Sequence, residues 1–133
     1  MRLIPDHILG IITVLQEAEG EPYEGKVAVA EVILRRTKRK YFSDGTVTGT
    51  CLRRLQFSGW NSDAANRIRT VKADTDDQMV HDCIRAWADA EAGSNLSKDA
   101  MHYFNPQLCS PVWAESAKVV ARIGNHTFVR EVK

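Results

Sequence analysis

The sequence has 133 residues, of which 44% are hydrophobic and 26% charged, and its formal net charge is +1. This size and composition are typical of one globular domain that buries a core without disulfides or metals. They exclude a protein that binds nucleic acid through a high overall positive charge. No apolar run approaches the about 18 residues that a membrane-spanning helix requires.

The first part of the chain predicts two helices joined by a short acidic turn. Pro5 and Asp6 mark the start of the first helix, with Asp6 as its N-cap, and Gly20 and Pro22 mark its end. A second, broadly apolar and largely buried helix is expected over residues 23–39. The buried face of the first helix is expected to hold Ile8, Leu9, Ile11, Ile12 and Leu15.

Turn residues dominate positions 41–75, which we predict to be irregular, and a loop-rich stretch of this length is usually functional. A third helix follows, with Asp74 or Thr75 as its N-cap and residues 91–95 at its end. Its inward side chains are expected to be Met79, Cys83, Ile84, Trp87 and Ala88.

Near the end of the sequence, residues 119–123 and 126–129 flank Gly124 and Asn125, a pattern that predicts a short β-hairpin. We therefore expect a mainly α (α+β) fold with four helical regions, forming a single domain over residues 1–133.

The remaining chemistry-bearing residues predict no metal site and no cofactor. The three cysteines are widely spaced and form no CxxC pair, so we expect reduced thiols instead of a disulfide framework. His102 and His126 are expected to be structural hydrogen-bond donors. The first residues show no cleavage site for secretion, and the protein is therefore expected in a cytoplasm. The cysteines are Cys51, Cys83 and Cys109.

A basic run, RRTKRK, occupies residues 35–40. The favoured interpretation is a solvated helix end, where cations suit the helix dipole. Two alternatives stay open: a nucleic-acid surface, and a contact with an anionic polymer.

The acidic turn indicates catalysis, because Glu17, Glu19, Glu21 and Glu24 fall within eight residues. Glu17 is expected in the last turn of its helix, near the negative end of the dipole and at the edge of the apolar face. Partial burial, the dipole and the neighbouring carboxylates would each raise its pKa. A carboxyl group that stays protonated near neutral pH is what the protonation of a glycosidic oxygen requires. We therefore predict that Glu17 is the catalytic acid; the alternative is a solvated acidic loop.

Residues 17–36, EAEGEPYEGKVAVAEVILRR, are similar to the block that opens the cell wall hydrolase family of the spore-cortex-lytic (SleB) type. Three later segments also resemble family segments: residues 56–60 (QFSGW), 100–106 (AMHYFNP) and 122–128 (RIGNHTF). The four segments occur in the family's order over nearly the whole chain, which makes the resemblance specific.

The resemblance implies a lysozyme-like domain with a small β element and a substrate groove. It also implies cleavage of peptidoglycan between N-acetylmuramic acid and N-acetylglucosamine, and it maps the family's catalytic glutamate onto Glu17. Three residues depart from the family pattern: Gln16 stands in place of glycine, Lys26 in place of glutamine and Arg35 in place of asparagine. The segment after Trp60 also matches poorly.

Two mechanisms are compatible with this sequence. A hydrolytic muramidase needs a second carboxylate across the scissile bond, and the candidates Glu24, Asp44 and Asp63 occupy no compelling position. A lytic transglycosylase works with one glutamate, and we favour this route.

The matched segments suggest which residues bind the substrate. Phe57 and Trp60 would stack on sugar rings, and Tyr103 would orient Glu17 or the substrate. Packing in the core is an equal alternative for Trp60 and Tyr103. The full predicted substrate-binding set is Glu24, Gln56, Phe57, Ser58, Trp60, Tyr103 and Asn105.

A small enzyme of this kind suggests a phage endolysin, which waits as a monomer in the host cytoplasm and acts on the wall at lysis. Its expected partner is peptidoglycan, without nucleic acid or membrane insertion. Two other classes stay open: a nucleic-acid-binding module that uses residues 35–40, and a wall-binding protein without catalytic activity.

Overall fold

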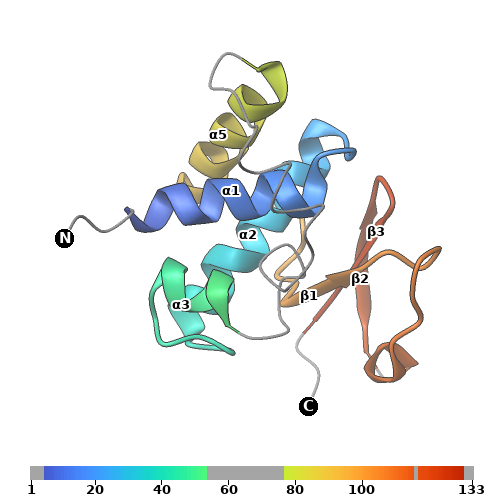
Figure 1. Ribbon diagram of the computed structural model, residues 1–133. Helices are drawn as coiled ribbons and strands as arrows, with labels where there is room; N and C mark the ends of the chain where they lie inside the picture. The colour runs from blue at the N-terminus through green and yellow to red at the C-terminus, as the bar shows by residue number, and fades with distance from the viewer. Residues whose placement is uncertain (1–4, 54–76, 116, 131–133) are drawn as a thin grey trace.

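The computed structural model describes residues 5–53, 77–115 and 117–130. Within them, four α-helices pack beside a three-stranded antiparallel sheet, which confirms the predicted mainly α (α+β) fold (Figure 1). The helices are α1 (Asp6–Ala18), α2 (Tyr23–Arg39), α3 (Val47–Leu52) and α5 (Gln78–Glu91). The strands are β1 (His102–Phe104), β2 (Val119–Ile123) and β3 (His126–Val129), and a short 3-10 helix spans Val112–Glu115.

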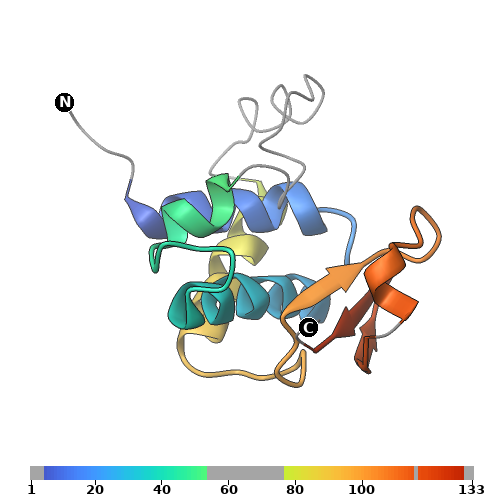
Figure 2. The same cartoon turned by 90° about the horizontal axis from the view of Figure 1, so that it is seen from below.

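Helix α2 lies at the centre of the fold and has the predicted bounds. It contacts α1, α3 and α5 and touches β2. Figure 2 shows α1 and α2 side by side, with the sheet beside them. Every residue from Gly25 to Ile33 is buried, because small and β-branched side chains cover all sides of this helix and each side meets a neighbour.

Helix α1 buries only part of the face that its apolar pattern predicts. Leu9 and Leu15 are buried as predicted, whereas Ile8 is 37% exposed and Ile11 and Ile12 are half-buried. The cause is α5, which packs so closely that a Cβ on Gly10 would lie 2.2 Å from the Trp87 ring. Because the side of α1 that carries Gly10 faces the core, Glu17, two helical turns further along, lies next to the buried face. The buried residues of α1 are Leu9, Gly10, Thr13, Val14, Leu15 and Ala18.

The start of α1 also corrects the prediction. Pro5 is the N-cap, and Asp6 is the first helical residue. The Asp6 carboxylate accepts hydrogen bonds from the backbone N–H and the hydroxyl of Thr48, so it joins the start of α1 to α3. Helix α3 itself lies in the segment predicted to be irregular, and the side chain of its N-cap, Thr46, accepts from the N–H of Gly49.

Helix α5 is amphipathic, with one narrow inward face. Its N-cap is Asp77, whose carboxylate accepts a backbone N–H of the first turn. The prediction of Asp74 or Thr75 is therefore wrong, and both lie outside the described residues. Ile84, 44% exposed, and Ala88 are on the outer face, because the buried positions follow the other side of the helix. These buried residues are Cys83, Ala86, Trp87 and Ala90.

The predicted hairpin is confirmed, since β2 and β3 pair on either side of Gly124 and Asn125. Gly124 has a φ of +58°, a conformation that favours glycine at this turn. Strand β1 was not predicted; it pairs with the other edge of β3 and sets Tyr103 opposite Phe128.

The structure also bears on the cysteines and on membranes. Cys51 and Cys83 are buried free thiols and Cys109 is an exposed one. Burial raises the pKa of Cys51 and of Cys83 to about 11. Within the described ranges, no helix has the length and apolar character needed to cross a bilayer.

Candidate active site

Glu17 and Tyr103 meet at the junction between the helices and the sheet. Glu17 lies in the last turn of α1, and the Tyr103 hydroxyl of β1 donates a hydrogen bond of 2.7 Å to its Oε1. Burial, and then the charge and hydrogen bond of Glu17, raise the pKa of Tyr103 well above its ordinary value. The phenol therefore keeps its proton at neutral pH and acts as a fixed donor to the carboxylate.

A cleft of about 530 Å³ opens over this carboxylate. Helix α1 and the turn after it provide one side, α5 provides Met79, and the sheet and the loop after β1 provide the other side. Its lining residues are Gln16, Glu17, Glu19, Gly20, Glu21, Met79, Asn105, Leu108 and His126. Two further carboxylates, from Glu19 and Glu21, thus share the cleft with Glu17.

Glu21 fastens the acidic turn to the tip of the β-hairpin. Its Oε1 accepts from the backbone N–H of Asn125 at 2.8 Å, and its Oε2 accepts from the Asn125 side-chain amide at 2.9 Å. A Cβ on Gly124 would lie 2.7 Å from side-chain atoms of both Glu21 and Pro22. The hairpin can therefore approach the turn only because position 124 is a glycine.

His126 forms the wall between this anchor and Tyr103. Its Nδ1 lies 3.6 Å from the Glu21 Oε1, and its ring centroid lies 4.9 Å from that of Tyr103. Burial lowers the pKa of His126, and the Glu21 charge acts in the opposite direction. The imidazole packs against the Tyr103 ring, but its buried Nδ1 forms no hydrogen bond. The expected role as a structural hydrogen-bond donor is therefore not seen at this nitrogen.

Lys26, which departs from the family pattern, closes the acidic turn from inside. Its side chain is buried, and its ammonium group donates to the backbone carbonyl of Glu19 at 3.3 Å and to that of Glu21. A cation in this position satisfies carbonyl oxygens that follow the end of α1. The substitution therefore supports the loop that carries the carboxylates.

A buried cation lies behind the Glu17–Tyr103 pair. The Arg36 guanidinium is 5% exposed; its Nε donates to the Met101 carbonyl at 2.7 Å, and it bonds the Nδ1 of His102 at 3.0 Å. Burial lowers the pKa of Arg36, whereas the charges of Tyr103 and Glu17 act to raise it. Arg36 thus fixes the backbone just before Tyr103 and adds positive charge behind the candidate acid. This charge and the Tyr103 hydrogen bond both favour the carboxylate form of Glu17, in the opposite direction to the effects expected from the sequence.

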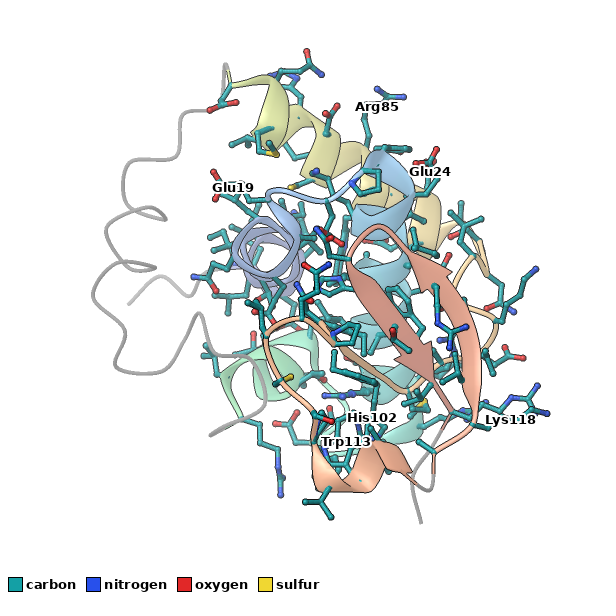
Figure 3. The ribbon with its side chains drawn as sticks, turned by 90° about the vertical axis from the view of Figure 1, so that its right-hand side faces the viewer. Glu19, Glu24, Arg85, His102, Trp113 and Lys118 are labelled. Carbon is teal, nitrogen blue, oxygen red and sulfur yellow. The ribbon has the colours of Figure 1, made fainter. Side chains whose placement is uncertain are left out.

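His102 links this cation to Tyr41, just after α2, and to Trp113 in the 3-10 helix. Its Nε2 bonds the Tyr41 hydroxyl at 2.9 Å, and its ring packs against Trp113 with centroids 5.1 Å apart (Figure 3). Burial and the Arg36 charge lower the pKa of His102 to about 4. The neutral imidazole is therefore a structural bridge, and in this tautomer Nδ1 accepts while Nε2–H donates.

The structure brings some of the predicted site residues together and separates others. Glu17, Tyr103 and Asn105 meet at the cleft. Glu24 is exposed in the first turn of α2 and does not line the cleft. In Figure 3 it lies at this N-terminal end of α2, near Arg85. Four predicted substrate-binding residues lie outside the described residues: Gln56, Phe57, Ser58 and Trp60.

Of the other candidates for a second carboxylate, Asp44 is described by the structure and Asp63 is not. Asp44 is exposed in the loop between α2 and α3, where it accepts hydrogen bonds from Thr46 that lower its pKa. Asp63 lies outside the described residues. Glu19 and Glu21 do line the cleft, and sequence reasoning named them only as neighbours of Glu17. Their place in the first matched segment was the signal that could have identified them.

The basic run does not form a single solvated surface. Arg36 points inward and Arg35 is half-buried, whereas the other three cations are exposed. The favoured interpretation, a solvated helix end, is therefore correct only for Lys38, Arg39 and Lys40. As for metals, the described part of the chain contains no group of three or more His, Cys, Asp or Glu side chains able to hold an ion.

A family model and several curated relatives match most of the chain. The family model described as Cell Wall Hydrolase matches residues 20–129, a range that begins three residues after Glu17. The spore cortex-lytic enzyme of Bacillus subtilis (strain 168) is 35% identical over 112 residues, which are 84% of this chain and 33% of that protein. The spore cortex-lytic enzyme of Halalkalibacterium halodurans is 39% identical over 114 residues, 84% of this chain and 31% of that protein. The chain thus spans about a third of the length of these curated relatives.

Solved structures match over almost the whole chain. The catalytic domain of the germination-specific lytic transglycosylase SleB from Bacillus anthracis aligns with a TM-score of 0.75 and 28% identity, covering 94% of this chain and 93% of that domain. The catalytic domain of the Bacillus cereus SleB protein aligns with a TM-score of 0.74 and 29% identity, covering 94% and 89%.

Proposed function

The chain belongs to the cell wall hydrolase family, and from this premise we propose that it cleaves peptidoglycan glycan strands between N-acetylmuramic acid and N-acetylglucosamine. The observation that carries the proposal is the Glu17 carboxylate, held by the Tyr103 hydroxyl at the base of an open cleft. The names of the spore cortex-lytic relatives and of the lytic transglycosylase domain with the same fold support this class of reaction.

The proposed chemistry uses one glutamate in two roles. Protonated Glu17 gives its hydrogen to the glycosidic oxygen, and the bond from that oxygen to C1 of N-acetylmuramic acid breaks. The resulting carboxylate then takes the proton from the 6-hydroxyl of the same sugar, whose oxygen bonds to C1. The products are a 1,6-anhydro sugar and a free 4-hydroxyl, and Glu17 recovers its proton without consuming water.

Tyr103 and Arg36 suit this cycle because Glu17 must pass through a negative state. The phenol donates directly to Oε1, and the buried guanidinium lies behind it. Both interactions strengthen when Glu17 loses its proton, so they stabilise the step in which charge develops on the carboxylate. Tyr103 touches the reacting group, whereas Arg36 acts through position and charge.

A hydrolytic muramidase is the second candidate, and a specific observation favours keeping it. Glu19 lines the same cleft as Glu17, which is where this mechanism requires a second carboxylate that activates water. Glu21 suits this role less well, because both of its carboxylate oxygens accept hydrogen bonds from Asn125.

One digestion experiment tests both mechanisms. Purified peptidoglycan is incubated with the wild-type protein and with Glu17→Gln, Glu19→Gln and Glu24→Gln, and the products are identified by mass spectrometry. The transglycosylase route predicts 1,6-anhydro products from the wild type, loss of activity in Glu17→Gln only, and no change in the exposed control, Glu24→Gln. Reducing ends together with loss of activity in Glu19→Gln would establish the hydrolase. No release by the wild-type protein would reject both.

The biological setting is a separate proposal: lysis of a host cell by an enzyme that waits in its cytoplasm, as in a phage endolysin. Cells that express the protein would stay intact until their membrane is permeabilised and would then lose turbidity. Lysis without permeabilisation, or intact walls after it, would contradict this setting.

A further inference from the structure

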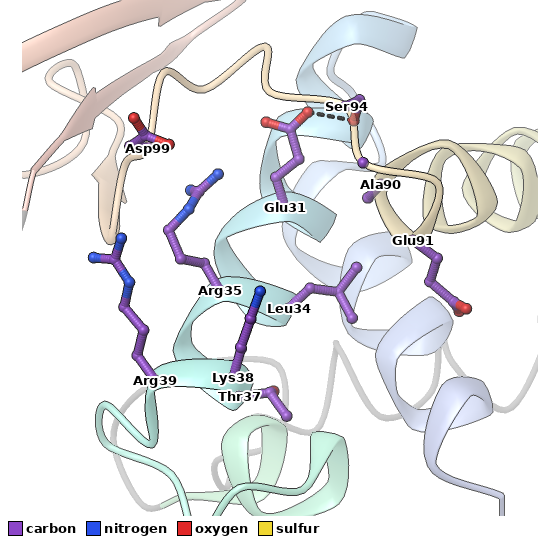
Figure 4. A pocket seen from close by; sticks show the side chains of 11 residues that line it. Glu31, Leu34, Arg35, Thr37, Lys38, Arg39, Ala90, Glu91, Ser94 and Asp99 are labelled. Atoms are coloured by element: carbon purple, nitrogen blue, oxygen red, sulfur yellow. Dashed lines mark hydrogen bonds between the residues drawn. The ribbon is translucent and has the colours of Figure 1, made fainter.

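A second hollow, which we call the α2 groove, lies between the C-terminal half of α2 and the loop that follows α5. It has a volume of about 790 Å³ and shares no lining residue with the cleft over Glu17. The groove combines an apolar floor of Leu34 and Ala90 with charged walls (Figure 4). Its charged lining residues are Glu31, Arg35, Lys38, Arg39, Glu91 and Asp99.

We propose that the α2 groove binds the carboxylate-bearing peptide stems of peptidoglycan, as a second attachment site to the polymer that is cleaved at Glu17. This inference rests on the proposed function, because it assumes that the protein acts on peptidoglycan. It adds a recognition element for the peptides outside the cleft over Glu17.

The first argument is that one cation of the groove is held in a fixed position. The Arg35 guanidinium donates to the Ser97 hydroxyl at 3.2 Å, to the Asn95 side-chain oxygen at 3.0 Å and to the Ala100 carbonyl. All three acceptors belong to the loop after α5. A guanidinium fixed in this way needs little further ordering to bind a carboxylate.

The second argument is that two exposed cations, Lys38 and Arg39, lie beside Arg35 without partners of their own. The charge of Arg39 lowers the pKa of Arg35, after the larger effects of burial, which lowers this pKa, and of Glu31 and Asp99, which raise it. Among the described residues, neither Lys38 nor Arg39 forms a hydrogen bond or an ion pair. A bound anion would relieve the repulsion between Arg35 and Arg39.

The third argument concerns the carboxylates of the groove, none of which pairs with Lys38 or Arg39. Glu31 is 3% exposed, and its two oxygens accept from the hydroxyls of Ser94 and Ser97 and from the backbone N–H groups of Leu96 and Ser97. In Figure 4 the Glu91 carboxylate points away from Lys38 and Arg39. Glu31 and Asp99 both add an opposing charge near Arg35, so the cations left for a ligand are Lys38 and Arg39.

The chemistry of the lining favours a peptide stem over a nucleic acid. Peptide stems carry carboxylates next to alanine methyl groups, which match cations beside the floor of Leu34 and Ala90. A nucleic-acid surface would offer aromatic rings for bases and a longer basic track. The lining of the groove contains no aromatic residue, and the net charge of the chain is +1.

The test measures binding without turnover, in a Glu17→Gln background. The ligands are a soluble disaccharide that carries a tetrapeptide stem and the same disaccharide without its stem. Lys38→Gln/Arg39→Gln removes two exposed cations of the groove. Lys118→Gln/Arg122→Gln removes two exposed cations in and next to β2 as the matched control.

We expect the stem-bearing ligand to bind about fivefold more weakly to the groove variant at low salt, since exposed ion pairs contribute only about 0.2–1 kcal/mol each. The control variant and the stem-free ligand should show no change. Backbone amide signals of Leu34 and Ala90 should shift only with the stem-bearing ligand.

Several results would overturn the inference: equal weakening in both variants, equal weakening for both ligands, or unshifted signals at Leu34 and Ala90. A selective loss of oligonucleotide binding in the groove variant would assign the groove to nucleic acid instead. A wild-type protein that releases anhydro products but shows no stem-dependent binding rejects the groove site alone. A protein that releases nothing rejects the proposed function.

Discussion

The hydrogen bond from Tyr103 to Glu17 can be removed by deleting one atom. In Tyr103→Phe the ring keeps its contacts with His126 and Phe128, whose centroids lie 4.9 and 5.7 Å away. What disappears is the donor at 2.7 Å from the Glu17 Oε1. The substitution therefore separates the hydrogen bond from the packing of the aromatic side chain.

The expected size follows from the charge of the acceptor. A hydrogen bond to a charged group contributes about 1.5–3 kcal/mol, and most of this is gained when Glu17 becomes a carboxylate in the proposed cycle. We therefore expect kcat/KM on peptidoglycan to fall by about 10- to 150-fold. The free energy of unfolding should change by less than about 1.5 kcal/mol, because only one half-buried hydroxyl is lost.

The assay is the initial rate of release of soluble fragments from peptidoglycan, measured beside unfolding by denaturant. Tyr41→Phe is the matched control, because the Tyr41 hydroxyl bonds the Nε2 of His102 instead of Glu17. It should lose a similar amount of stability and keep its activity. If Tyr103→Phe retains more than half of the wild-type rate, or if both variants lose activity equally, the assigned role of Tyr103 is refuted.

Three further predictions concern the framework of the site. Below pH 6.5 the unfolded chain protonates His102, whereas the folded chain does so only near its pKa of about 4. As the pH decreases from 6.5 to 4, the free energy of unfolding should therefore decrease, with a contribution from this residue of up to about 3 kcal/mol. Denaturant titrations at pH 7 and pH 4.5 should show a smaller decrease for His102→Gln than for the wild-type protein. Gly124→Ala should lose about 2–4 kcal/mol, from its φ of +58° and its contacts with the acidic turn. Gly20→Ala, where a Cβ has nothing within 4 Å, is its control, and equal denaturation midpoints would contradict the explanation. Gly10→Ala should lower the thermal midpoint and alter near-ultraviolet circular dichroism, because the added methyl group would overlap the indole ring of Trp87; unchanged signals would show that α1 and α5 separate easily.

The sequence predicted correctly the elements whose bounds are set by neighbouring residues in the chain. The bounds of α2 follow from Pro22 before its first turn and from a largely apolar stretch over residues 27–34, and both are visible in the sequence. The hairpin follows from Gly124 and Asn125 between two β-prone segments. The position of Glu17 in the last turn of α1 follows from the same turn signals.

What the sequence did not predict depends on contacts between distant segments. The buried face of α1 is set by Trp87, whose ring packs on Gly10, and the apolar pattern of α1 gives no sign of it. Strand β1 has three residues and exists because it pairs with β3. Glu21 looked like one more acid in a charged turn, and its partner, Asn125, is 104 residues away. Apolar periodicity carries no information about such pairings.

The pairing of Glu21 with Asn125 has a consequence for the synthesis of the protein in a cell. One wall of the cleft is synthesised with the opening helices, and the wall that Glu21 fastens to it emerges from the ribosome 104 residues later. A nascent chain thus carries Glu17 long before it carries β3 and the ring contacts that steady Tyr103. The catalytic geometry proposed for this protein consequently requires the chain as far as the end of β3, and premature termination before the hairpin would leave the acid without its frame.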